Sequence, residues 1–154
     1  MEQFDIAICG FGPVGSTFAG LMGKLGHRVL VIEKNSGPSP TARAINTDGE
    51  QLRTFDRLNI AEKVVENSTE VHRVHFGDAD LNPIQTIDQP VGVSSMGWPT
   101  QVLFYQPELE GFIRSAVAKD SNITLKEDTE LIDFEDTEEG CLLYTSPSPR
   151  DTPI

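Results

Sequence analysis

The sequence is poor in basic residues and in cysteine, and each shortage excludes a class of protein. Only 12 Lys and Arg stand against 24 Asp and Glu, so the formal net charge is -12. Proteins that bind nucleic acid neutralise its phosphates with clustered Lys and Arg, so we expect no nucleic-acid partner. The two cysteines, Cys9 and Cys141, lie at opposite ends of the chain and favour free thiols over a disulfide framework.

The features of an exported or membrane protein are also missing. Acidic residues stand near the start, where a secretory peptide carries basic ones, and the first apolar run ends at Gly10. No apolar run approaches the roughly 18 residues that cross a bilayer. We therefore expect a cytoplasmic location and no membrane partner. The length of 154 residues predicts a single domain.

Patterns typical of metal centres and catalytic triads are absent as well. His72 and His75 would face opposite sides of one strand, because side chains alternate along a strand, so they cannot share a metal ion. The sequence therefore predicts no metal site and no catalytic side chain.

What the chain does contain is the pattern of an α/β fold. Residues 4–9 and 28–33 read as buried parallel strands. Between them, residues 13–25 read as a helix that begins at Pro13 and has an apolar face formed by Val14, Phe18, Leu21, Met22 and Leu25. A strand, a crossover helix and a strand in about 30 residues predict a right-handed βαβ unit.

Further elements follow along the chain. Thr47 and Glu50 have capping-box spacing and predict a helix start, with more helix at residues 61–65. Residues 71–76 and 84–87 suggest an antiparallel pair of strands. Pro107 opens another amphipathic helix, and candidate strands at residues 123–125 and 130–134 come after it.

Gly10, Gly12 and Gly15 form a G-x-G-x-x-G motif between the first strand and the helix. In a dinucleotide-binding turn, the first glycine permits the tight turn, the second lets the backbone approach a pyrophosphate, and the third allows close packing of helix and strand. Glu33 ends the second strand, where a carboxylate accepts hydrogen bonds from ribose hydroxyls and repels a 2′-phosphate. The alternative is a plain strand-to-helix turn without ligand, with Glu33 solvating a strand end.

Several segments together resemble the class A flavoprotein aromatic hydroxylases, and most of all the 3-(3-hydroxyphenyl)propionate hydroxylase type. The resemblance extends from residue 4 to about residue 134 and rests on the glycine motif, the strand ending in Glu33-Lys34, Arg43-Ala44, the segment 48–53, Gly97-Trp98-Pro99 and the segment 106–110. It implies a Rossmann-like FAD-binding βαβ unit with added helices and a small antiparallel β portion, in truncated form.

The resemblance also implies roles for individual residues. The ADP half of FAD would be bound by Gly10, Gly12, Pro13, Val14, Gly15, Glu33 and Lys34. Arg43 would lie near the flavin and diphosphate, and Gln106 would contact the cofactor. A surface salt bridge is the alternative for Arg43, and a helix cap is the alternative for Gln106. Trp98 lines either a substrate pocket or the core.

The activity that the resemblance implies is hydroxylation of a phenolic aromatic acid. NAD(P)H would reduce FAD, dioxygen would form a flavin C4a-hydroperoxide, and its distal oxygen would pass to the ring. A stand-alone dinucleotide-binding module or an NAD-dependent reductase is the alternative function. The oligomeric state is left open by the sequence.

The end of the sequence has a different character. The eleven residues from Cys141 to Asp151 equal the translation of a common transposase-based sequencing adapter. We therefore interpret residues 1–140 as the N-terminal part of an FAD-binding domain and residues 141–154 as non-native; a strand at 141–145 followed by a linker is the alternative. The family's later Asp-Gly and Gly-Asp cofactor segments are not visible, so we expect residues 1–154 alone to be inactive and poorly stable.

Overall fold

The computed structural model describes residues 2–138 and 140–147. The described chain divides into two compact units, one formed from within residues 1–40 and 113–154 and the other by residues 41–112. Among the described helices, none combines the length and the apolar character that crossing a lipid bilayer requires.

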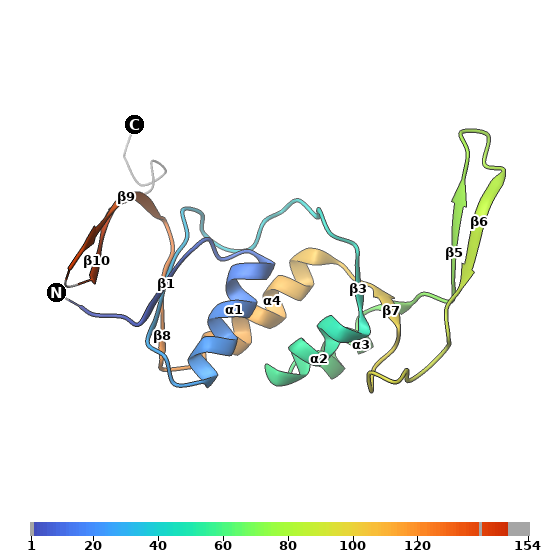
Figure 1. Ribbon diagram of the computed structural model, residues 1–154, viewed down its shortest axis with the longest axis horizontal. Helices are drawn as coiled ribbons and strands as arrows, with labels where there is room; N and C mark the ends of the chain where they lie inside the picture. Colours follow the sequence, from blue (N-terminus) through green and yellow to red (C-terminus); the bar gives the residue numbers. More distant parts are fainter. Residues whose placement is uncertain (1, 139, 148–154) are drawn as a thin grey trace. The chain divides into compact units, whose positions relative to one another are not determined.

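The first unit is built on a parallel sheet of three strands in the order β1-β2-β8 (Figure 1). Its strands are β1 (Ile6–Cys9), β2 (Val29–Ile32) and β8 (Ile123–Lys126). β2 pairs with both neighbours, Val29 lying opposite Ile6 and Ile123, and all four of its side chains are buried. The predicted βαβ unit is thus confirmed.

β1 differs from the prediction of a buried strand. Its side chains alternate between half-buried and exposed, because in the described chain β1 pairs only with β2 and lies at a sheet edge. An edge strand with one covered face shows this two-residue alternation.

Helix α1 (Pro13–Lys24) packs against the sheet with a face that the sequence did not predict. Val14 is 84% exposed and Leu25 is 70% exposed, whereas the buried positions carry small residues: Ser16, Thr17, Ala19, Gly20 and Gly23. A Cβ at Gly23 would lie 2.8 Å from the Ile123 side chain. The predicted apolar face is therefore wrong, because the helix lies too close to the strands for large side chains to fit between them.

An antiparallel hairpin completes the first unit. β9 (Thr129–Thr137) pairs with β10 (Gly140–Pro147), with Gly140 opposite Thr137 (red in Figure 1). Part of the segment interpreted as adapter-derived thus forms a strand. Strand pairing reports the conformation of these residues and not the origin of their codons, so the adapter interpretation stays a prediction.

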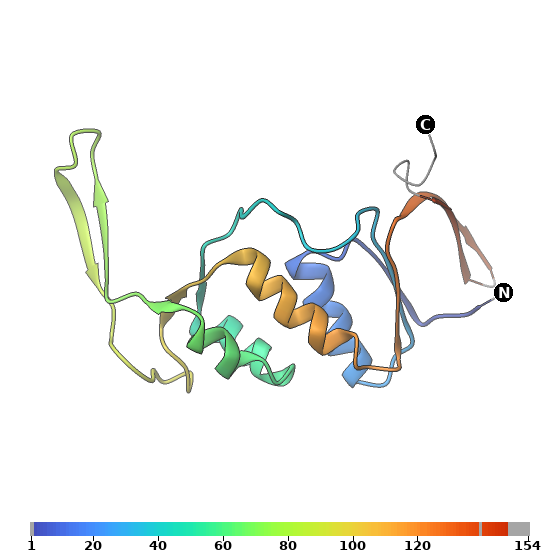
Figure 2. The ribbon, with the colours of Figure 1, turned by 180° about the vertical axis from the view of Figure 1, so that it is seen from behind.

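The second unit contains short helices and two small antiparallel sheets. α2 (Gly49–Arg57) and α3 (Ala61–Glu66) lie side by side, green in Figures 1 and 2. Their buried apolar side chains are Leu52, Phe55, Ala61 and Val64. The predicted helix cap Thr47 is wrong, because the carboxylate of Asp48 accepts the hydrogen bond from the Gln51 N–H at 2.8 Å.

The strands of the second unit form one three-stranded sheet and one hairpin. β3 (Asn46–Asp48) and β4 (Thr69–Glu70) flank β7 (Gln101–Leu103), a sheet that no sequence pattern predicted. β5 (Arg73–Gly77) and β6 (Pro83–Asp88) form the predicted antiparallel pair. α4 (Gln106–Val117) begins one residue before the Pro107 that predicted it.

Candidate functional site

The candidate site lies at the carboxyl edge of the parallel sheet in the first unit. Gly10 follows β1, Glu33 follows β2, and Glu127 follows β8. In open α/β sheets, ligands bind outside the carboxyl ends of the strands. Three segments that are distant in sequence are therefore brought to one edge where a ligand is expected.

The three glycines of the motif occupy three different environments. Gly10 has φ +103°, a conformation that glycine adopts without strain, and its N–H donates to the Ile32 carbonyl at 2.8 Å. A Cβ at Gly15 would lie 2.2 Å from the Gly10 carbonyl oxygen, so helix and turn are in direct contact. A Cβ at Gly12 would meet no protein atom within 4 Å. Turn, open approach and close packing thus fall on the three positions for which the motif predicts them.

The amino end of α1 opens at Gly12. Gly12 is the N-cap and no side chain caps the helix, while Pro13, next along the chain, has no N–H to satisfy. The first N–H groups of a helix have no partner within it, and together they attract an anion. Ser16 donates its hydroxyl to the Gly12 carbonyl at 2.8 Å and is buried, so it stabilises the turn from inside the unit.

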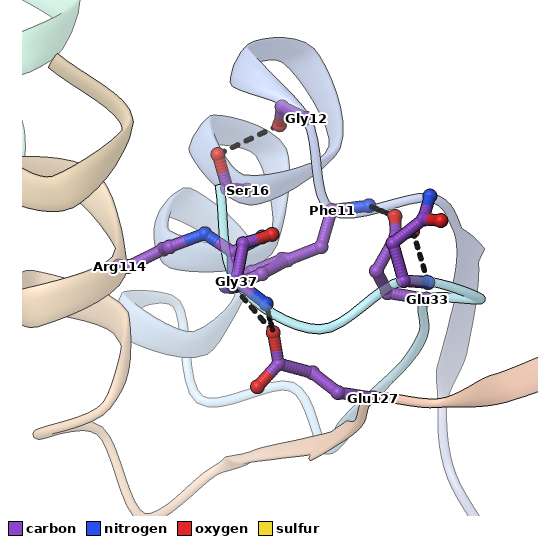
Figure 3. A network of polar contacts seen from close by, with 8 residues as sticks. Phe11, Gly12, Ser16, Glu33, Gly37, Arg114 and Glu127 are labelled. Carbon is purple, nitrogen blue, oxygen red and sulfur yellow. Dashed lines mark hydrogen bonds and ion pairs between the residues drawn. The ribbon is translucent and has the colours of Figure 1, made fainter. Parts of the chain in front are cut away.

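Glu33 is held by backbone donors (Figure 3). One carboxylate oxygen accepts the Phe11 N–H at 2.8 Å, and the other accepts the Asn35 N–H at 2.8 Å and the Asn35 side-chain amide at 3.0 Å. Burial acts to raise the pKa of the Glu33 carboxyl, but these donors and the charge of Arg114 outweigh it, so the pKa lies below its usual value. Since two carboxylate oxygens offer about four acceptor positions, capacity for a ribose hydroxyl is left.

A cation that sequence reasoning missed lies beside this site. Arg114, on α4, donates to the Glu127 carboxylate at 2.6 Å and to the Gly37 carbonyl at 2.8 Å. Its guanidinium carbon lies 4.6 Å from the centre of the Phe11 ring. No local pattern places Arg114 next to residues that are far away in sequence; only its position on the helix that Pro107 opens offered a signal.

Arg43 and Gln106 come together in the second unit. The Gln106 side-chain oxygen accepts the N–H groups of Arg43 at 2.6 Å and of Ala44 at 2.8 Å, and its amide nitrogen donates to Glu110 at 2.7 Å. Gln106 and Glu110 are 3% and 2% exposed. Gln106 therefore fixes the backbone around Arg43, whose own side chain is exposed and forms no salt bridge with any described residue.

The remaining predicted positions are exposed to different degrees. Lys34 is exposed, and Val14, the second residue of α1, points into solvent. Trp98 is half-buried and its carbonyl accepts the Ser94 N–H at 2.9 Å. In residues 2–138 and 140–147, no group of three or more His, Cys, Asp or Glu is placed to hold a metal ion.

Sequence comparison identifies relatives of this chain. Residues 3–145 match the family model described as "FAD binding domain". A protein of Rhodococcus jostii named "Probable NADH-specific resorcinol 4-hydroxylase" is 36% identical over 73% of this chain and 21% of its own length. A Shigella sonnei protein named 3-(3-hydroxy-phenyl)propionate/3-hydroxycinnamic acid hydroxylase is 30% identical over 98% of this chain and 27% of its own length.

Solved structures share the fold. p-Nitrophenol 4-monooxygenase from Pseudomonas putida matches with a TM-score of 0.83 at 23% identity, over 94% of this chain and 36% of that one. Anhydrotetracycline hydroxylase from Streptomyces rimosus matches with a TM-score of 0.77 at 16% identity, over 97% of this chain and 29% of that one. At such identities the match concerns the fold alone.

Proposed function

Because the chain belongs to the FAD binding domain family, we propose that the carboxyl edge of its parallel sheet binds the ADP half of FAD. Gly10, Gly12 and Gly15 form the diphosphate turn with Pro13 and Val14 at the helix start, and Glu33 accepts the adenosine ribose with Lys34 beside it. The observation that carries the proposal is the environment of Gly12, where the position of a Cβ is open space in front of an uncapped helix end.

Each group in this site has a physical task. The helix start supplies N–H donors and about half a unit of positive charge to the diphosphate. Glu33, held in its ionised form, accepts hydroxyl donors and repels a 2′-phosphate, which disfavours NADP. The acidic net charge of -12 does not prevent anion binding, since the local donors are backbone groups.

Two residues of the second unit, Arg43 and Gln106, are further candidates for FAD binding. Arg43 presents an exposed guanidinium that suits a phosphate or the flavin ring edge. Gln106 has both ends of its amide engaged, by the N–H groups of Arg43 and Ala44 and by Glu110. We propose that Arg43 contacts FAD, and that Gln106 contributes its remaining amide N–H and the placement of Arg43.

For the whole protein we propose an FAD-dependent monooxygenase that hydroxylates a phenolic aromatic acid and uses NAD(P)H. The names of the Rhodococcus and Shigella relatives support the reaction type, and the first also supports NADH. This chain spans 21% of the length of the Rhodococcus relative and 27% of the length of the Shigella relative. We therefore propose that the groups that bind the aromatic substrate lie outside the residues described. Bound FAD supplies the electron transfer and oxygen activation, while the chain's own residues bind and orient it.

Reconstitution with FAD tests the cofactor proposal. The purified chain is incubated with FAD, gel-filtered, and its absorbance spectrum recorded. Retained flavin absorbance supports the proposal, whereas a colourless protein that binds NAD would support the dinucleotide-binding or NAD-reductase alternative. For the activity, the 154-residue chain and a longer reading frame that contains it are compared for NADH or NADPH oxidation with a hydroxyphenylpropionate. Turnover by the 154-residue chain alone would contradict its expected inactivity.

A further inference from the structure

Arg114 connects three segments of the first unit, as Figure 3 shows. Its guanidinium donates to the Gly37 carbonyl in the loop after β2 and to the Glu127 carboxylate after β8. The same guanidinium lies over the ring of Phe11, the residue that stands between the first two glycines of the motif. All three strand ends of the parallel sheet are therefore tied to one side chain.

Glu127 strengthens the connection from the other side. Its carboxylate accepts the Gly37 N–H at 2.9 Å on the same oxygen that receives Arg114 at 2.6 Å. Gly37 is thus held at both its N–H and its carbonyl, the first by Glu127 and the second by Arg114. This two-point contact fixes the loop that begins at Glu33.

Stability alone does not account for an arginine at this position. The side chains of Arg114 and Glu127 are only 16% and 34% exposed, and the Arg114 Nε atom is buried without a hydrogen-bond partner in the described chain. Burial of paired charges costs desolvation free energy, and apolar replacements of such pairs are often neutral or stabilising. The arrangement is better explained by what it holds in place.

What it holds is the frame of the proposed adenosine site. Phe11, 1% exposed, has its ring against Arg114 while its N–H donates to Glu33, so the guanidinium fixes the donor that orients this carboxylate. The positive charge of Arg114 also favours the ionised form of Glu33. A site whose loops are already in the bound geometry loses less conformational entropy on binding.

We infer, on the basis of the FAD site proposed above, that Arg114 is a positioning residue that pre-organises the adenosine end of that site through Phe11, Gly37 and Glu127. It acts on the ligand through these three neighbours. Without Arg114 the segments that contain these three neighbours are less ordered before binding. Any ligand that carries ADP then binds more weakly, because more conformational entropy is lost on binding.

The test uses a double variant, Arg114→Met with Glu127→Gln, in the full chain. This change removes both charges without leaving one unpaired, and the amide oxygen introduced by Glu127→Gln can still accept the Gly37 N–H. Arg28→Met is the matched control, because Arg28 forms an exposed ion pair with Asp5 in the same unit at 3.2 Å. ADP and FAD affinities are measured by isothermal titration calorimetry, and unfolding without ligand by circular dichroism.

The expected result separates positioning from structural support. The double variant unfolds within about 3 °C of the wild type, because the pair is only partly buried and its two charges are removed together, yet it binds ADP and FAD about 10-fold or more weakly. The control keeps both affinities. Arg114→Lys, which retains the cation but not the forked donor, recovers part of the ADP affinity.

Three outcomes overturn the inference. Wild-type affinity in a folded double variant would show that the loops need no support from Arg114. A double variant that does not fold would show a purely structural role for Arg114. The same conclusion would follow if Arg114→Lys lost as much affinity as the double variant and its unfolding temperature fell to match. Failure of the wild type itself to bind ADP and FAD would refute the proposed function, and the inference with it.

Discussion

Alanine at Gly15 should lower the stability of the fold, whereas alanine at Gly12 should weaken ADP binding and leave the stability nearly unchanged. At Gly15 the new Cβ would lie 2.2 Å from the Gly10 carbonyl oxygen, and real contacts of this kind stay above 3.0 Å, so the helix start must shift by about 0.8 Å. Overpacking of this size costs about 2 kcal/mol. We expect the unfolding temperature to fall by about 4–8 °C.

At Gly12 the same methyl group has space. No protein atom lies within 4 Å of the Cβ position, and φ -73° with ψ -174° is an ordinary conformation for alanine. We expect the free energy of unfolding to change by less than about 1 kcal/mol, since the weaker N-cap is offset by a less flexible unfolded chain. Binding should suffer, because the methyl group occupies the space through which a pyrophosphate approaches.

Thermal unfolding by circular dichroism and calorimetric titration with ADP, both on the same preparations, give the two quantities. Gly12→Ala should bind ADP at least about 10-fold more weakly, a loss of about 1.4 kcal/mol, while it unfolds like the wild type. Unchanged ADP affinity in Gly12→Ala would refute the placement of the diphosphate. An unfolding temperature in Gly15→Ala equal to that of the wild type would refute the packing argument.

Three further results are expected. Gly10→Ala should lower stability by about 1–2 kcal/mol in urea unfolding, because φ +103° is strained for a residue with a Cβ; full stability would contradict this. The pKa of Glu33 is lowered in the folded state, so its contribution is complete above the unfolded glutamate pKa and is lost as pH falls through the folded pKa. Glu33→Gln should therefore lose less stability than the wild type over that acidic range; parallel pH profiles would refute it. Gln106→Leu removes the acceptor of two backbone N–H groups and should lower the free energy of unfolding by about 1–3 kcal/mol. Arg43→Ala should leave the free energy of unfolding unchanged and weaken FAD binding. The reverse pattern would refute the roles assigned to the two residues.

Much of the first unit could be predicted because its signals are local. Apolar runs, Pro13 and the glycine spacing defined β1, α1 and β2, and the resemblance to FAD-dependent aromatic hydroxylases is confirmed by the family match and by relatives named as hydroxylases. The face of α1 was predicted wrongly because large apolar residues usually mark the buried side. Here Gly15 and the small residues after it allow close approach instead, which periodicity of hydrophobicity does not report.

Features that depend on long-range contacts were missed. β3 and β7 carry no strong strand pattern and become strands through their pairing in the sheet, where Asn46 lies opposite Leu103 and β4 pairs with the other edge of β7. In the same way, Arg114 has no local motif, and its place beside Phe11 follows from the tertiary fold. The glycine motif could be predicted because its three glycines lie within six consecutive residues, so that their roles depend on local structure.

Competition between ligands for the wild-type chain tests the central claim most directly. FAD is titrated into the chain and then displaced with ADP, which contains the adenosine end of the cofactor, or with FMN, which contains the isoalloxazine end. The FAD that stays bound is separated and quantified by chromatography. If Gly10, Gly12, Gly15 and Glu33 bind the ADP half, FAD binds, ADP displaces it and FMN does not. No FAD binding, or displacement by FMN and not by ADP, would contradict the account.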